Sequence, residues 1–354
     1  MNGLGLMFKL FSKAIEVKAS DIHLTVGEPP SFRIDGSIVR IDADELTADN
    51  MKEMLYGVMT KEQQEEYEQN WEYDFSYAFE DKGRFRINIF NQNRGMASVL
   101  RLIPSKILTL ADLNIDNPTF KKISEFPRGL VLVTGPTGSG KSTTLAAIVD
   151  HINKTREDHI ITIEDPIEFV HSGQKSIINQ REVHRDTKSF NAALRSALRE
   201  DPDVVLVGEL RDLETIRLAL TAAETGHVVF GTLHTNSASK TIDRIIDVFP
   251  GDEKPMIRSM LSESLQAVIS QTLLKKIGGG RVAAHEIMFG TDAIKNLIRE
   301  DKIAQMHSSI QTGSKDGMIT MDQSLRTLVN NREVEEMEAA KKAKNIKDFL
   351  GNKS

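Results

Sequence analysis

Residues 135–142 read Gly135-Pro-Thr-Gly-Ser-Gly-Lys-Ser142, which fits the phosphate-loop pattern G-x-x-x-x-G-K-[ST]. The apolar run before them, at 130–133, predicts a buried strand, and residues 143–152 after them predict a helix. A turn between a strand and a helix points several backbone N–H groups at one place, where the helix N-terminus adds partial positive charge. This stretch therefore predicts an anion site at the edge of a sheet.

The residue types in this loop fit a nucleoside triphosphate with its metal ion. Lys141 is expected to reach the β- and γ-phosphates, and the Ser142 hydroxyl is expected to ligate Mg²⁺. Glycine lets the backbone approach an anion because no Cβ stands in the way. A glycine-rich surface turn is the alternative, and the flanking strand and helix disfavour it. The expected ATP-binding residues are Gly135, Pro136, Thr137, Gly138, Ser139, Gly140, Lys141, Ser142 and Thr143.

The bulk composition is that of an ordinary soluble globular protein. The chain has 354 residues, 40% apolar and 27% charged, which is compatible with two or three domains. Its net charge of −6 argues against a dedicated nucleic-acid binder, so no nucleic-acid partner is expected. Without cysteine it forms neither disulfides nor thiolate metal sites. No apolar run approaches the roughly 18 residues that span a bilayer, and an ATP-binding protein is expected in the cytoplasm.

The pattern along the chain predicts an α/β protein with two domains. Residues 1–103 predict an α+β domain of one helix, alternating strands and a polar helical stretch at about 47–70. Residues 104–118 predict a linker. Residues 119–354 predict a mostly parallel sheet wrapped by helices, with a mainly helical tail from about Asp252, because apolar strands alternate there with helices. The predicted strands of this sheet lie at 130–133, 160–163, 204–207 and 228–230.

The N-terminal helix carries an apolar stripe. Met7, Leu10, Phe11, Ala14 and Ile15 recur at helical spacing with polar residues between them. Packing of this stripe on its own domain is favoured over binding to a membrane surface.

Three carboxylates follow the predicted strand at 160–163. Glu164, Asp165 and Glu168 lie within five residues and would repel a nucleotide unless they serve it. Coordination of Mg²⁺ and orientation of a water molecule are two roles that would explain carboxylates beside a phosphate site. Glu164 is the leading candidate to position or activate the water. The alternative is an acidic solvated turn that ends at Pro166.

A second apolar strand, at 204–207, leads to Glu209. In phosphate-loop enzymes a neighbouring strand places an acid near Mg²⁺ or the attacking water. Glu209 is therefore expected to contact the metal, directly or through a water. Gly208 occupies the place where an aspartate often stands.

The segment Gly226–His234 predicts a strand followed by a small polar loop. This loop is expected at the carboxyl edge of the sheet, where ligands bind in open α/β folds. His234 either hydrogen-bonds the γ-phosphate or has a purely structural role.

The first domain carries a cluster of arginines, Arg84, Arg86, Arg94 and Arg101. A solvated sheet face is the simple interpretation. If subunits form a ring, a guanidinium of one subunit could instead stabilise the phosphoryl group held by its neighbour.

Taken together, these motifs are similar to those of the secretion ATPases of type II secretion, type IV secretion and type IV pili, over nearly the whole chain. The similarity lies in four boxes: the phosphate loop at 135–142, the acidic box at 161–168, the second Walker box around Glu209 and the histidine box at 226–234. The segment Arg199–Asp212 is especially characteristic of the family.

Two features resemble the retraction members of this family. Extension and type II secretion members usually carry a four-cysteine zinc module, whereas this chain has no cysteine and a compact stretch at 275–282 where that module would begin. The segment Ala293–Glu300 is similar to a characteristic retraction segment, with Lys295 in place of an arginine.

The resemblance implies a PAS-like first domain, a RecA-like second domain and a homohexameric ring that holds ATP between the domains and near the next subunit. It implies that Glu164 is the catalytic glutamate, that Glu209 contacts Mg²⁺ or its water, and that first-domain arginines approach the phosphates. The predicted function is a motor that hydrolyses ATP, with Lys141 stabilising charge, to drive pilus retraction and twitching motility. Its expected partner is an inner-membrane platform protein. The motor is expected to contact the membrane only through this partner. A pilus-extension or type II secretion ATPase, a RecA-like nucleic-acid motor and a nucleotide-sensing module without turnover are the alternatives.

Overall fold

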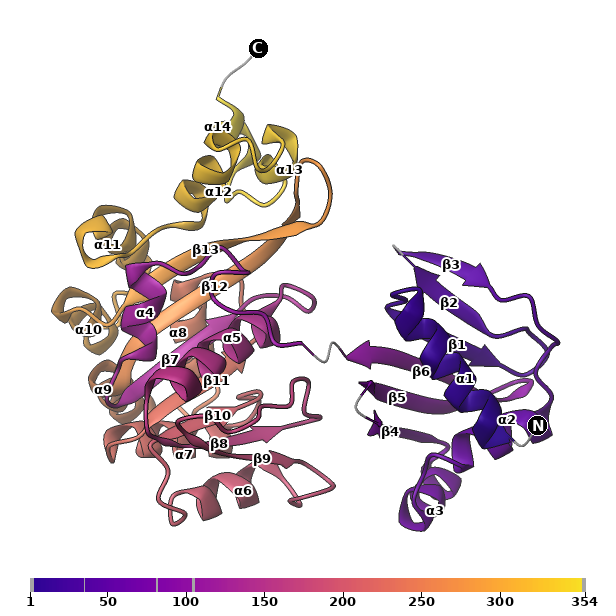
Figure 1. Cartoon of the computed structure of the whole chain (residues 1–354). Helices are drawn as coiled ribbons and strands as arrows, with labels where there is room; N and C mark the ends of the chain where they lie inside the picture. The colour runs from indigo at the N-terminus through magenta and orange to yellow at the C-terminus, as the bar shows by residue number, and fades with distance from the viewer. Residues whose placement is uncertain (1–2, 35, 81, 104–105, 352–354) are drawn as a thin grey trace. The chain divides into compact units, whose positions relative to one another are not determined.

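The computed structural model describes residues 3–34, 36–80, 82–103 and 106–351. The chain forms two compact units (Figure 1). The first contains Met1–Lys106 and Glu168–Val170, and the second contains Ile107–Ile167 and His171–Ser354. No helix among the described residues combines the length and the apolar character that crossing a membrane requires.

The N-terminal unit is built on a six-stranded antiparallel sheet in the order β3-β2-β1-β6-β5-β4. Helix α1 (Gly3–Glu16) buries Met7, Leu10 and Phe11 in the core of this unit, and Phe11 stacks on Phe85 at 4.1 Å between ring centroids. The prediction that α1 packs on its own domain is confirmed. The strands are β1 (Asp21–Thr25), β2 (Ser31–Ile34), β3 (Ser37–Arg40), β4 (Glu72–Phe79), β5 (Gly83–Gln92) and β6 (Gly95–Ile103).

The polar stretch that follows β3 differs from its prediction. It forms two helices, α2 (Ala48–Tyr56) and α3 (Lys61–Asn70), where one continuous helical stretch was predicted. Thr60 begins the second helix with a capping box. Its side chain accepts a hydrogen bond from the Gln63 backbone N–H, and the Gln63 side chain accepts one from the Thr60 backbone N–H. The sequence also predicts turns at Asp35-Gly36 and at Asp81-Lys82-Gly83, and Asp35 and Asp81 lie outside the described residues.

The C-terminal unit contains a seven-stranded sheet in the order β13-β12-β7-β11-β10-β8-β9. All neighbouring strands are parallel except β12 and β13, as predicted for most of the sheet. Helices α5 (Lys141–Thr155), α7 (Leu213–Glu224), α8 (Ala238–Asp247) and α9 (Lys254–Ser264) connect the strands and cover the sheet (Figure 1). The strands are β7 (Gly129–Thr134), β8 (His159–Glu164), β9 (Ile177–Glu182), β10 (Val204–Val207), β11 (Val228–Leu233), β12 (Leu265–Lys275) and β13 (Arg281–Phe289).

Helices surround this sheet and form most of the C-terminal tail. Those before β12 are α4 (Pro118–Ser124), α5 (Lys141–Thr155), α6 (Phe190–Ala197), α7 (Leu213–Glu224), α8 (Ala238–Asp247) and α9 (Lys254–Ser264). Those after β13 are α10 (Asp292–Arg299), α11 (Met306–Thr312), α12 (Met321–Asn330), α13 (Glu336–Ala340) and α14 (Ile346–Leu350), with short 3₁₀ turns at Ile303–Gln305 and Ser314–Asp316.

Three strands of this sheet were not predicted. The edge strand β9 is half polar, and β12 and β13 fall within the tail that was predicted to be mainly helical. Strand β12 pairs with β7, the strand that leads into the phosphate loop. The two strands that were not predicted, β12 and β13, therefore extend the sheet beside that loop. The compact stretch at 275–282 includes the turn between β12 and β13. Within the predicted linker, Leu110 and Ile115 are buried in the core of this unit.

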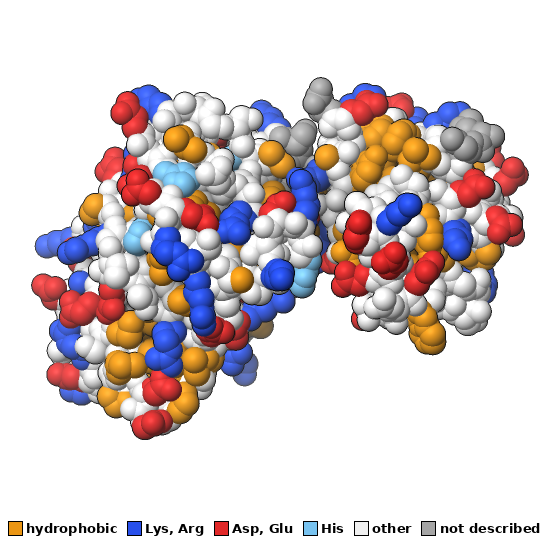
Figure 2. Space-filling model, turned by 90° about the horizontal axis from the view of Figure 1, so that it is seen from below, with side chains coloured by type: hydrophobic (Ala, Val, Ile, Leu, Met, Phe, Trp, Pro, Cys, Tyr) orange, Lys and Arg blue, Asp and Glu red, His pale blue; other side chains and the backbone are white. Residues whose placement is uncertain are grey.

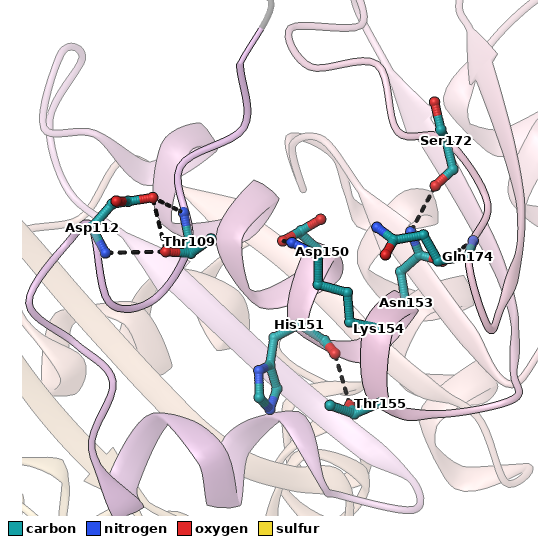
Figure 3. A network of polar contacts seen from close by, with 9 residues as sticks. All are labelled: Thr109, Asp112, Asp150, His151, Asn153, Lys154, Thr155, Ser172 and Gln174. Atoms are coloured by element: carbon teal, nitrogen blue, oxygen red, sulfur yellow. Dashed lines mark hydrogen bonds and ion pairs between the residues drawn. The ribbon is translucent and has the colours of Figure 1, made fainter.

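The end of α5 is tied to the segment between β8 and β9 by buried polar contacts (Figure 3). The Asn153 side chain is 1% exposed; its Nδ2 donates to the Ser172 carbonyl at 2.8 Å, and its Oδ1 accepts from the Gln174 N–H at 2.9 Å. Lys154 donates to Asp150 at 2.6 Å on the same helix. The helix that begins at the phosphate loop is thereby fixed at its far end to the segment that follows Glu164.

The central strand β11 should control the stability of the C-terminal unit. Phe230 is fully buried there, between Val131 of β7 and Leu206 of β10 in register. We expect Phe230→Ala to lower the unfolding free energy of this unit by about 3–5 kcal/mol, because it leaves a cavity. Urea unfolding followed by circular dichroism measures the change.

The control for this variant is Ile177→Ala, because Ile177 lies on the edge strand of the same sheet and is 67% exposed. Its effect should stay within about 0.5 kcal/mol. Trp71, the single tryptophan, reports on the N-terminal unit by fluorescence and should be unaffected by either change. Equal urea midpoints for the two variants would contradict the assignment of Phe230 to the core.

Candidate active site

The loop between β7 and α5 has the backbone shape that its glycines permit. Gly135, Gly138 and Gly140 have φ angles of 146°, 77° and 88°, a region that other residues rarely adopt. A Cβ on Gly135 would lie 2.3 Å from the carbonyl oxygen of Gln271. The loop therefore requires glycine both for its conformation and for its close contact with β12.

Several polar groups of this loop suit an anion. Helix α5 begins after Gly140, which offers no side chain to cap the first N–H groups of the helix. The Lys141 ammonium donates to the carbonyls of Gly135 and Pro136 at 2.8 and 3.2 Å, so it lies against the loop. The Ser139 hydroxyl is buried and has no hydrogen-bond partner among the described residues. Uncapped N–H groups and an ammonium beside one loop fit a phosphate group.

The predicted acids and histidine emerge at the same edge of the sheet as the loop. Strand register pairs Thr134 with Leu233, Gly231 with Val207, and Val207 with Ile163. Glu164 is the last residue of β8, and the residues that follow the ends of the other three strands are Gly135, His234, and Gly208 with Glu209. The structure thus brings four separate sequence motifs to the carboxyl ends of four adjacent strands.

Glu164 is held by neighbours on its own strand and on β9. Its Oε1 accepts a hydrogen bond from the Thr162 hydroxyl at 2.7 Å and one from Gln180 Nε2 at 3.3 Å. Gln180 in turn accepts from the His171 N–H at 2.7 Å. These contacts fix where the carboxylate lies, and the sequence analysis did not find Thr162 or Gln180.

Glu209 and His234 are in contact. The His234 Nε2 lies 3.4 Å from one oxygen of Glu209, and the other oxygen accepts from Arg211 Nε at 2.7 Å. The His234 side chain is 46% exposed and therefore remains accessible to a ligand. The pair places an imidazole beside the second-box acid.

Gly208 allows the ends of β8 and β10 to come together. Its N–H donates to the Ile163 carbonyl at 2.8 Å, and a Cβ there would lie 3.2 Å from that oxygen and 3.3 Å from the Cα of Glu164. A glycine in the usual place of an aspartate therefore serves packing between the two acidic strand ends.

The four candidate arginines belong to the N-terminal unit, and each has a partner within it. Arg84 donates to Ser76 at 2.5 Å. Arg86 makes a two-point contact with Asp74, its shortest bond measuring 2.6 Å. The remaining pairs are Arg94 with Glu28 at 3.4 Å and Arg101 with Asp21 at 3.0 Å. Among Arg86, Arg94 and Arg101, the side chain of Arg101 is the most exposed, at 67%.

No group of three or more His, Asp or Glu side chains that could hold a metal ion occurs among the described residues. Mg²⁺ in phosphate-transfer sites usually takes one or two protein oxygens and completes its shell with phosphates and water. The Ser142 hydroxyl and the Glu209 carboxylate, both at this edge, are donors of the kind that such a site uses.

The type II/IV secretion system protein family matches residues 5–351. The chain belongs to this family. A type IV pilus retraction ATPase, PilT, of Pseudomonas aeruginosa is 62% identical over 331 residues, which are 94% of this chain and 96% of that protein. A twitching motility protein of Neisseria gonorrhoeae is 56% identical over 336 residues, 93% of this chain and 90% of the relative.

Among solved structures, the pilus retraction motor PilT with bound ADP superimposes with a TM-score of 0.88 at 49% identity, covering 96% of this chain and 97% of that one. This secretion ATPase therefore has the predicted α/β fold class, with an N-terminal domain and a RecA-like ATPase domain. The predicted resemblance to the retraction members is likewise confirmed.

Two histidines near the site of this ATPase are neutral at ordinary pH. Burial lowers the pKa of His285 from 6.5 to about 4. Burial also lowers the pKa of His171 to about 4, against the opposing charge of Asp150. In the folded protein, therefore, neither ring carries a charge at a pH well above about 4.

Stability of the C-terminal unit should fall as the pH decreases from about 6.5 to about 4. The unfolded chain binds protons at these histidines near their ordinary pKa, whereas the folded chain does so only near 4, so acidification favours unfolding within this window. Urea midpoints measured across the window test this, with His285→Gln expected to flatten the slope. Histidine NMR signals that all titrate near 6.5 would contradict it.

Proposed function

We propose that this chain is the ATP-hydrolysing motor that retracts type IV pili. The observation that carries the proposal is the near full-length match to retraction ATPases, together with the meeting of the phosphate loop, two acids and His234 at one sheet edge. ATP binds with its phosphates in the loop at 135–142, and the Lys141 ammonium moves from the loop carbonyls to the β- and γ-phosphates.

The metal and the second-box acid belong to the same proposal. The Ser142 hydroxyl, together with Glu209 directly or through a water, would hold Mg²⁺, which would supply positive charge at the transferring phosphoryl group. His234, in contact with Glu209, donates to the γ-phosphate and so links the state of the nucleotide to the second-box acid.

Glu164 acts on the attacking water. Its Oε1 accepts hydrogen bonds from Thr162 and Gln180, and these contacts hold the carboxylate where it orients a water for in-line attack. Positioning and electrostatic stabilisation supply most of the catalysis in reactions of this type.

The motor acts as a homohexamer. An arginine among Arg84, Arg86, Arg94 and Arg101 reaches the phosphates held by the neighbouring subunit, after leaving its present partner. Closure of the N-terminal domain over the nucleotide and its reopening on product release convert hydrolysis into motion. The moved partner is an inner-membrane platform protein on its cytoplasmic side, so membrane contact is peripheral.

A nucleic-acid motor is disfavoured by the surface charge. Acidic and basic side chains are interspersed over the face seen in Figure 2, and the net charge of the whole chain is −6. A track for single strands would combine a continuous basic groove with aromatic side chains. ATPase activity stimulated by single-stranded DNA, and lost with salt, would revive this alternative.

Glu164→Gln should lower the rate of phosphate release by about 10²–10⁴-fold while ATP binding is retained, because the amide cannot serve as the base. Steady-state phosphate release and calorimetric binding of ATP measure the two effects. Glu157→Gln is the matched control, since Glu157 is exposed and precedes the amino end of the same strand. Equal rates for both variants would remove Glu164 from the mechanism.

Loss of the motor should leave pili extended. In a piliated host, deletion of the gene or a Lys141→Ala replacement should give hyperpiliated cells that do not twitch, because the variant chain cannot stabilise the phosphates of ATP. Electron microscopy and twitching assays measure this. Bald cells would instead indicate an extension motor.

A further inference from the structure

Gln271 is a buried polar residue that no sequence motif marks. It lies on β12, one position past Ser270, which pairs with Thr134 at the end of the phosphate-loop strand. It is 3% exposed. A buried amide carries two donors and an acceptor, all of which need partners.

The partners of Gln271 come from the loop, the first turn of α5 and β13. Its Nε2 donates to the Ser139 carbonyl at 2.7 Å. Its Oε1 accepts from the Thr144 hydroxyl at 2.8 Å and lies 3.2 Å from His285 Nε2. Because Oε1 can only accept, the neutral His285 ring carries its proton on Nε2. The amide orientation is therefore fixed from three sides.

Two glycines of the loop pack against the same residue. A Cβ on Gly135 would lie 2.3 Å from the Gln271 carbonyl oxygen, and a Cβ on Gly140 would lie 2.8 Å from its Nε2. Both ends of the loop thus touch Gln271, one at its backbone and one at its side chain. The loop glycines serve this close approach as well as their own backbone conformation.

We propose that Gln271 is a positioning residue, which holds the loop from Gly135 to Gly140 in the shape that receives phosphates. This proposal rests on the proposed function, because it concerns the same nucleotide site. Only an amide meets all the contacts: it donates to the Ser139 carbonyl and accepts from Thr144 and His285. A carboxylate would accept but could not donate to that carbonyl, and an apolar side chain would do neither.

The experiment uses the full-length chain with Gln271→Glu and Gln271→Met. Both should weaken ADP binding at least tenfold in calorimetry and raise the KM for ATP more than they lower kcat, because the loop must be ordered before phosphates bind. Hydrogen exchange of the N–H groups at 137–140 should be faster in both variants without any nucleotide. Thr144→Val, which removes one of the groups that orient the amide, should have a smaller effect in the same direction.

Ser270→Ala is the matched control. It removes a buried hydrogen bond of 2.8 Å between Ser270 and Thr134, on the same two strands, without touching the loop. It should lower the melting temperature yet keep ADP affinity within twofold of the wild type. Unchanged loop exchange in Gln271→Glu, or equal affinity losses in Gln271→Met and Ser270→Ala, would overturn the proposal. A wild-type chain that does not bind ADP would overturn the proposed function instead, and loop exchange would still decide the role of Gln271.

Discussion

The parallel register of β7, β11, β10 and β8 is the constraint on which the site depends. Because the four strands run in one direction and end within about two residues of one another in register, residues separated by up to about a hundred positions emerge at one edge. The strands are buried at every position of β7, β10 and β11, and a slip of one residue would move every side chain to the opposite face and disrupt its close packing there. The chemistry at the edge is therefore specified by an apolar core that takes no part in it.

The features found from the sequence are those with a strong local signal. The phosphate loop has a fixed spacing, the central strands are unbroken apolar runs, and α1 has an apolar stripe that packs as expected. Because parallel strands end at one edge, placing Glu164, Glu209 and His234 together required only the correct strand directions. Periodicity and general sheet geometry were enough for this part of the fold.

The missed features depend on contacts between distant segments. Nothing near β12 indicates that it joins β7, since its pairing is decided by the edge that β7 leaves open. Thr162 and Gln180 matter only because β9 lies beside β8. Gln271 is one of several polar residues of β12, and only its contacts with Ser139 and Thr144, more than 120 positions earlier, distinguish it. Local patterns contain no information of this kind.

The polar chain behind the phosphate loop explains why the missed strands matter to the motor. Gln271 bonds to the loop and to α5, His285 lies against its amide oxygen, and the His285 backbone N–H donates to the Ser324 hydroxyl of α12 at 3.0 Å. Loss of one partner in this series of hydrogen bonds would lower the stability of the fold by about 1–3 kcal/mol. The hydrogen-bonded residues therefore tend to move together. These contacts connect the loop to β13 and α12, so the residues that hold the phosphate loop also belong to the packing of the C-terminal helices.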